Sequence, residues 1–166
     1  ILMIYLIMNY NKETKTLHIS PEFNQELKDL PECAEKIIFE EDEDKENYIY
    51  SKFNQEIKEN VLPKFLHTLI FGVYFNQEIK ENVLPKFLHT LIFGSLFNKE
   101  IKENVLPKFL HTLIFDQNFQ QNAVIPESVK EIYLWSHINI INNLPCSIET
   151  VYINFFQNEK FNKNVE

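Results

Sequence analysis

Histidine is the residue of this chain whose type and spacing most directly suggest chemistry. A histidine recurs every 22 residues within the same short sequence segment, at His67, His89 and His111. Imidazoles held one above another could share a metal ion, since histidine is a common zinc ligand. No carboxylate or cysteine stands beside these histidines at ligand spacing, and copying a segment copies its histidine automatically. We therefore expect neither a metal site nor a cofactor.

The cysteines and glycines offer little more for catalysis. Cys33 and Cys146 are far apart in the chain, and neither has a histidine nearby in the sequence. A reactive thiol needs an electropositive neighbour, so we expect no catalytic nucleophile, and a disulfide framework is not expected either. Gly72 and Gly94 are the only glycines, which excludes a glycine-rich phosphate loop. The sequence thus predicts a protein that is not an enzyme and that resides in a reducing compartment, the cytoplasm.

Composition narrows the class of partner. The chain has 166 residues, 45% of them hydrophobic, which suffices for one domain with its own core. It carries 24 acidic residues against 16 lysines and no arginine, for a net charge of −8, so we expect no nucleic acid as partner. The apolar opening "ILMIYLIM" has eight residues, too few to cross a bilayer. We expect a protein partner, no membrane contact and a monomeric chain.

Tandem repetition dominates the sequence. The stretch "FNQEIKENVLPKFLHTLIFG" occurs unchanged at 53–72 and 75–94, and a third copy at 97–115 differs from the second only at Lys99. Weaker copies follow Pro31, Pro126 and Pro145. One copy cannot bury enough apolar surface to fold alone, whereas a stack of copies can. Repetition therefore favours a stack of structural coils over an active site made of unlike residues.

Each copy contains the alternation of a short strand. In "LHTLIF", Leu69 and Phe71 face one side while Thr68 and Ile70 face the other, and Pro63 marks the start of the segment. Gly72 is expected to allow the turn after the strand. The return limb is expected to be extended or 3₁₀, not a full helix. Parallel strands are predicted near 17–19, 36–39, 67–71, 89–93, 111–115, 131–135 and 150–153, with Leu69, Leu91 and Leu113 buried side by side.

These elements predict a mainly β, right-handed solenoid with one parallel sheet of short strands. The solenoid should occupy residues 16–155, after an N-terminal segment or cap at 1–15 and before a truncated repeat or tail at 156–166. The acidic run "EEDEDKE" breaks the 22-residue spacing, so residues 40–50 are expected to leave the solenoid as a flexible, solvated loop. Inside the stack, two ladders are expected: Phe53, Phe75 and Phe97 at roughly 4.8 Å per coil, and Asn54, Asn76 and Asn98 bonding the backbone.

The spacing of Phe75, Asn76, Ile79 and Pro85 resembles the FNIP repeat, which takes its name from these residue types. FNIP repeats are regarded as relatives of leucine-rich repeats, and they occur in amoebae and in the giant viruses that infect them. Members often carry an F-box ahead of the array. The resemblance implies a leucine-rich-repeat-like fold, a role without catalysis, and a target-binding module of a ubiquitin-ligase adaptor, in the host cytoplasm if the chain is viral.

The sheet face turned away from the core is the expected protein-binding surface. Tyrosine and tryptophan there would supply binding hot spots, because they bury large area and carry a polar group. The alternative role for these aromatic residues is to cap the open C-terminal end of the stack or to pack on one another. The other reading of the whole chain is a structural product of recent duplication without a dedicated partner. The expected binding residues are Thr68, Ile70, Thr90, Ile92, Thr112, Ile114, Tyr133, Trp135 and Tyr152.

Overall fold

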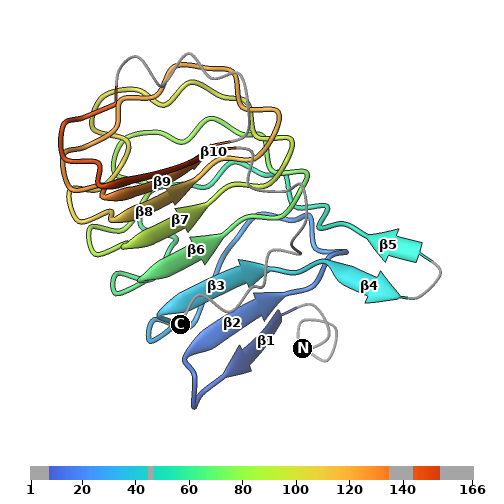
Figure 1. Cartoon of the computed structure of the whole chain (residues 1–166). Coiled ribbons are helices and arrows are strands. Elements are labelled where there is room, and N and C mark those ends of the chain that lie inside the picture. Colours follow the sequence, from blue (N-terminus) through green and yellow to red (C-terminus); the bar gives the residue numbers. More distant parts are fainter. Residues whose placement is uncertain (1–7, 45–46, 135–143, 154–166) are drawn as a thin grey trace.

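The computed structural model describes residues 8–44, 47–134 and 144–153, which form ten strands and no helix. Eight strands make one sheet, in the order β1-β2-β3-β6-β7-β8-β9-β10, and two make a separate small sheet (Figure 1). The strands are β1 (Met8–Asn11), β2 (Thr16–Ile19), β3 (Lys36–Phe39), β4 (Asp42–Asp44), β5 (Asn47–Ile49), β6 (Thr68–Ile70), β7 (Thr90–Ile92), β8 (Thr112–Ile114), β9 (Glu131–Leu134) and β10 (Thr150–Ile153).

The large sheet grows by one parallel strand per coil from β2 to β10, while β1 closes its first edge antiparallel to β2. The register pairs Leu69 with Leu91 and Leu91 with Leu113, and all three leucines are fully buried. The predicted solenoid, its parallel sheet and its buried leucine row are therefore confirmed. The right-handed sense of the connections stays a prediction.

Two interleaved columns of phenylalanine fill the interior. The return limbs contribute Phe53, Phe75, Phe97 and Phe119, whose ring centroids lie 5.8–6.1 Å apart from coil to coil. Within a coil, the phenylalanine that follows the strand stacks on the one from the return limb, as Phe71 does on Phe75 at 3.8 Å. Burying these rings supplies much of the apolar area that holds neighbouring coils together. The predicted stack of Phe53, Phe75 and Phe97 is confirmed at a wider spacing than 4.8 Å.

The wider spacing shows that the coils fan out. Close to the sheet, the rings of His67, His89 and His111 follow one another at 4.7 Å, which is the usual distance between strands. The phenylalanine rings farther from the sheet repeat at about 6 Å. The stack is therefore curved, with the sheet on its inner side.

Turns of fixed chemistry delimit each coil. The proline carbonyl accepts a hydrogen bond from the amide three residues later, as in the 3.0 Å bond from Leu66 to Pro63, and this turn leads into the strand. Another bend places Asn60, Asn82 and Asn104 at φ of 60–62°, a left-handed conformation that asparagine tolerates better than most residues.

The chain turns after each glycine as predicted, and the Gly72 carbonyl accepts a hydrogen bond from the Phe75 N–H at 3.3 Å. The reason for glycine is packing and not conformational freedom. No glycine in the described residues has a positive φ. A Cβ atom built on Gly94 would lie 2.2 Å from the carbonyl oxygen of Gly72, and one built on Gly72 would lie 2.1 Å from the Cβ of Ser51. Glycine is needed at Gly94 because the backbone of the neighbouring coil approaches it, and at Gly72 because the Ser51 side chain occupies the space of a Cβ atom.

The asparagine ladder is present and links coil to coil. The Oδ1 atom of Asn54 accepts a hydrogen bond from the backbone N–H of Asn76 at 2.9 Å, and Asn76 accepts one from Asn98 in the same way. Asn24 and Asn98 extend the ladder toward either end with bonds of the same length. Each backbone N–H group of this ladder thereby finds an acceptor in the coil before it.

Residues 40–50 differ from the predicted loop. Strands β4 and β5 pair antiparallel, with Asp42 opposite Ile49, so this segment is a short hairpin outside the solenoid sheet (Figure 1). The ring centroids of Tyr48 and Tyr50 lie 4.8 Å apart with the ring planes tilted by 37°, and both rings are substantially exposed. Strand pairing and this ring contact organise a stretch whose acidic composition alone indicated a solvated loop.

Candidate protein-interaction surfaces

The outer face of the sheet is less open than the alternation of residue types predicts. Ile70, Ile92 and Ile114 pack with Ile38 into a second apolar cluster, which Tyr133 joins. The expected exposure is wrong for five of the predicted binding residues, because their own neighbours in the ladder cover them: Ile70, Thr90, Ile92, Thr112 and Ile114 are buried. Thr68 is half-buried. Whether this face binds a protein stays a prediction.

The aromatic end of that face is more accessible. Tyr152 is 38% exposed, and its ring stacks on the half-buried ring of Tyr133 with centroids 4.2 Å apart. Burial, followed by the hydrogen bond with Tyr152, raises the pKa of Tyr133 to about 12. The Tyr133 hydroxyl therefore stays protonated at neutral pH. Trp135, the third aromatic residue predicted here, lies outside the described residues.

The repeated histidines form a stack and not a ligand set. Each Nδ1 atom lies 3.2–3.4 Å from the hydroxyl oxygen of the threonine that follows it. Burial lowers the pKa of His89, and the neighbouring His67 and His111 lower it further. A central imidazole held neutral in this way packs as an aromatic ring. Across residues 8–44, 47–134 and 144–153, no three side chains of His, Cys, Asp or Glu gather in a manner that could hold a metal ion.

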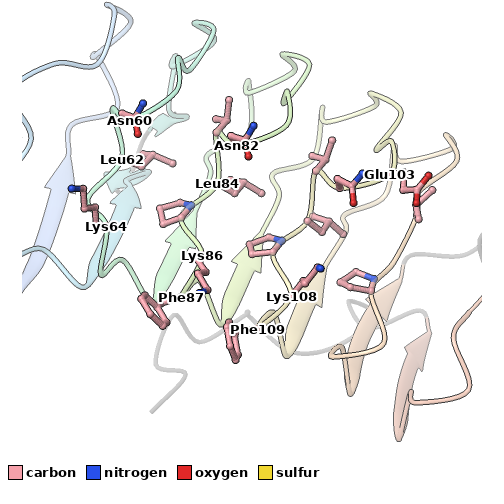
Figure 2. A pocket seen from close by; sticks show the side chains of 18 residues that line it. Asn60, Leu62, Lys64, Asn82, Leu84, Lys86, Phe87, Glu103, Lys108 and Phe109 are labelled. Atoms are coloured by element: carbon pink, nitrogen blue, oxygen red, sulfur yellow. The ribbon is translucent and has the colours of Figure 1, made fainter.

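A groove of about 960 Å³ runs across the central coils, along the segments that lead into β6, β7 and β8 (Figure 2). Leucines, valines and prolines of successive coils form its floor, with Leu84 and Pro85 near the middle. Phe87 and Phe109 line one rim with ring centroids 5.9 Å apart. The same stack continues beyond the lining to Phe65, whose ring lies 6.0 Å from that of Phe87. These rings are 66%, 48% and 54% exposed, so the stack faces solvent.

Lysines accompany the exposed phenylalanines. Each ring follows directly after a lysine, and the Nζ atom of Lys86 lies 5.7 Å from the Phe87 ring centroid and 6.0 Å from that of Phe109. These distances suit a cation–π contact, which leaves the ammonium group near the rim. The groove therefore combines an apolar floor, an aromatic rim and a row of positive charge.

Two rows of lysine behave differently. In the return limbs, Lys58, Lys80 and Lys102 each form an ion pair with a glutamate of the preceding coil: Glu26, Glu56 and Glu78. These pairs cross from coil to coil on an exposed surface. Among the described residues, no ion pair includes Lys64, Lys86 or Lys108, which line the groove. One lysine row thus fastens coils together, and the other is available to a partner.

Phe65, Phe87 and Phe109 were not among the residues predicted for binding, although the sequence contains a signal for them. In "PKFLHTLIF", Leu66 faces the core, so the phenylalanine directly before it must point elsewhere. A large apolar residue out of phase with the inward set, repeated in three coils, marks an exposed row. This exposed row is hard to recognise in the sequence because the apolar residues that follow the phenylalanine in each coil belong to the core.

The cysteines add no further site, and residues 1–7 of the apolar opening lie outside the described residues. Cys33 and Cys146 are both free and exposed, and the Tyr10 hydroxyl lies 3.1 Å from the Cys33 sulfur. Within the part of the chain that the structure describes, no helix is long and apolar enough to span a bilayer.

Short parallel strands, one per coil, joined by extended limbs around a leucine and phenylalanine core, define a repeat solenoid of the leucine-rich-repeat type. The FNIP Repeat family matches residues 53–96 and 97–134. Residues 53–134 of this chain are therefore FNIP repeats.

A solved structure from the giant virus CroV is similar to this chain. It is described as "The crystal structure of CroV588 a novel circular LRR protein structure", and it is 37% identical with a TM-score of 0.68. The similarity covers 79% of this chain and 19% of that one, so the present chain spans about a fifth of its length. No curated protein matches the chain.

Proposed function

We propose that this protein is a non-catalytic interaction module that binds another protein through the groove of the central coils. The observation that carries the proposal is the exposed stack of Phe65, Phe87 and Phe109, of which Phe87 and Phe109 line an apolar depression. Contiguous exposed apolar surface of this kind is typical of protein-binding sites, and aromatic residues are frequent hot spots. Stacked repeats commonly present extended surfaces of this sort.

The groove also explains why identical coils can be useful. A row of equal side chains at about 6 Å spacing offers the same contact three times, which suits an extended segment that lies along the stack. Specificity would come from the ends of the row, where the coils diverge. Tyr133, Tyr152 and Trp135 belong to that diverged end, and their contribution to binding is part of the proposal.

The target-binding part of a ubiquitin-ligase adaptor is a narrower form of this proposal. It is supported by the resemblance of the repeats to those of F-box proteins, with the host cytoplasm as the site of action. A longer gene product with an F-box would recover ligase components from host lysate, and residues 1–166 alone would not. A structural repeat product without a partner is the competing function, and it predicts recovery of neither.

The proposal is tested by affinity capture with matched variants. Wild-type protein, the triple variant Phe65→Ala, Phe87→Ala, Phe109→Ala, and the control Tyr74→Ala, Leu96→Ala serve as bait. The control removes exposed apolar groups of central coils at the other end of the strands. A protein captured by the wild type and the control, and lost with the triple variant while all three remain folded, supports the groove. Equal capture by all three would refute it.

The sheet-face residues have a separate test. Trp135→Ala should weaken binding of the captured partner by about 2 kcal/mol while leaving the fold intact, because a hot-spot tryptophan loses its buried area on truncation. Titration of wild type and variant by calorimetry measures the difference. Unchanged affinity in a folded variant would exclude Trp135 from the interface.

A further inference from the structure

We infer that the groove binds an extended segment of a partner protein in which every second residue is acidic and the residues between are apolar. The inference rests on the proposed function of the groove and names the chemistry of its partner. Three features of the central coils lead to it: the sign of the charge in the groove, the distance at which that charge repeats, and the polar groups on the opposite rim.

The charge of the groove is opposite to that of the protein. Its lining contains three lysines and one glutamate, whereas the whole chain carries a net charge of −8. Lys64, Lys86 and Lys108 are all exposed, and none of them forms an ion pair with another described residue. Glu103 is the single acidic residue of the lining, because its counterparts in the other two coils lie outside it. The groove therefore favours an anionic partner.

The repeat distance of the coils matches two residues of an extended chain. The rings that directly follow the three lysines repeat at 6.0 and 5.9 Å. Two residues of a β-strand rise by about 6.6 Å, and their alternate side chains point to the same side. The flexible stem of lysine can absorb a difference of about 0.6 Å per coil. A carboxylate at every second position of the segment can therefore meet one lysine in each of the three coils.

The opposite rim carries amide groups that have no partner within the described residues. Figure 2 shows Asn60 and Asn82 on one side of Leu62 and Leu84, and the lysines on the other side. Together with Asn104, these asparagines line the groove, and their side chains form no hydrogen bond with another described residue. Their left-handed φ explains why asparagine occupies the bend, but it leaves the amide groups free.

Free amide groups favour an extended occupant over a helix. An amide side chain can both donate to a peptide backbone and accept from it. An extended segment has backbone N–H and C=O groups to offer, whereas a helix bonds most of these groups internally. This difference decides between the two, because residues four apart in a helix also rise by about 6 Å.

The residues between the acidic ones meet the apolar part of the groove. In a strand they point away from the carboxylates, and the lining offers them leucine, valine and proline side chains. Leu62 and Leu84 are only 5% and 7% exposed, so the floor presents little depth for a large side chain. Compact apolar residues such as valine suit these positions. The simplest segment with the required pattern is Glu-Val-Glu-Val-Glu.

Fluorescence anisotropy with labelled peptides tests the inference. The probe is a fluorescein-labelled peptide with Glu-Val-Glu-Val-Glu between Gly-Ser ends, and the comparison peptides replace each glutamate with glutamine or with lysine. The acidic peptide should bind about tenfold more tightly than the glutamine peptide at about 50 mM salt, and the lysine peptide should bind more weakly than either. Raising the salt to about 500 mM should reduce this preference, because exposed charges are screened.

Matched variants locate the site of binding. The triple variant Lys64→Gln, Lys86→Gln, Lys108→Gln should lose the preference for the acidic peptide over the glutamine peptide, because the charge is removed while the floor remains. The control Lys12→Gln, Lys28→Gln, Lys99→Gln removes the same charge from exposed lysines outside the groove lining and should keep the preference. Circular dichroism confirms that both variants are folded.

Four results would overturn the inference: no binding of the acidic peptide, equal binding of the glutamine peptide, equal loss in the control variant, or tighter binding of a helical peptide with glutamate at every fourth position. Equal binding of the acidic and glutamine peptides, with loss of both in Phe87→Ala, Phe109→Ala, would leave the groove as a protein-binding site without the acidic preference. If no peptide binds, the affinity capture described above decides separately whether the groove binds a protein.

Discussion

The protein contains two phenylalanine stacks of nearly equal geometry and opposite exposure. Phe53, Phe75 and Phe97 repeat at 5.9 and 6.1 Å and are each 1% exposed. Phe65, Phe87 and Phe109 repeat at 6.0 and 5.9 Å and are roughly half exposed or more. The coil spacing sets the distance in both stacks, so ring spacing says nothing about burial. The two stacks differ in the side chains that surround their rings. In the inner stack, Phe71 packs on Phe75 with ring centroids 3.8 Å apart.

The two stacks therefore have different roles: the buried rings contribute to the stability of the fold, and the exposed rings are accessible to a binding partner. A ring enclosed by the core loses solvent contact and contributes to holding coils together. A ring on the rim keeps its apolar surface in water, which is unfavourable for the isolated protein and can be recovered only by a partner. Variants in the two stacks should therefore have separable effects on folding and on binding.

The largest effect is expected inside. Phe75→Ala should lower the free energy of unfolding by about 3–5 kcal/mol, because it removes a fully buried ring and leaves a cavity between Phe53 and Phe97. Urea unfolding followed by circular dichroism measures the loss. A loss below that of Phe87→Ala would contradict the distinction between the stacks.

The spacing common to both stacks can be disturbed at the glycines. Gly94→Ala should cost about 1–3 kcal/mol, since the new methyl group meets the backbone of Gly72 and the coils must separate. Gly72→Ala meets the side chain of Ser51 instead, so adding Ser51→Gly should restore part of its stability. Thermal unfolding of the single variants, and of each combined with Ser51→Gly, checks both statements. If Ser51→Gly restored as much stability to Gly94→Ala as to Gly72→Ala, the two explanations would be contradicted.

The asparagine ladder next to the inner stack should matter less than a ring. Asn76→Ala leaves the backbone N–H of Asn98 without its acceptor and should cost about 1–2 kcal/mol. Asn76→Asp keeps an acceptor at the same place and should cost less. Urea unfolding of both variants decides the matter, and equal losses would assign the effect to something other than the hydrogen bond.

The outer stack should hardly respond in stability. Phe87→Ala is expected to change the free energy of unfolding by less than about 0.5 kcal/mol, as is usual for exposed positions. The same variant should weaken partner binding. A large loss of stability would show that the rim is part of the core.

The smallest effect belongs to the histidine stack, which is intermediate in exposure. The pKa of His89 is lowered in the folded protein, so the unfolded chain binds more protons between the lowered value and the usual value near 6.5. Stability should therefore rise slightly with pH across that window and be lost as pH falls through it. His89→Gln should flatten the dependence in urea unfolding measured at several pH values.

The sequence determines the coils well, because each inward position repeats with the same period. The strand at Thr68–Ile70 and the buried row through Leu69 follow from alternation alone. The exposed rim at Phe87 does not follow as easily. A hydrophobic residue is normally assigned to the core, and only its position relative to the inward-facing residues shows that Phe87 points elsewhere. The hairpin at Asp42–Ile49 does not follow either, because the backbone pairing of β4 with β5 leaves little trace in composition.

The identical register of β6, β7 and β8 has a consequence for folding. β8 offers β6 the same backbone groups, the same leucine and the same isoleucine that β7 offers. A chain that pairs β6 directly with β8 loops out one whole coil, and closing that loop adds only a modest entropic cost. The native arrangement wins by the burial of the extra coil and not by any local preference. In the middle of the array, folding must therefore select one of several nearly equivalent strand pairings. The strands of the diverged coils at either end each have a single matching partner strand.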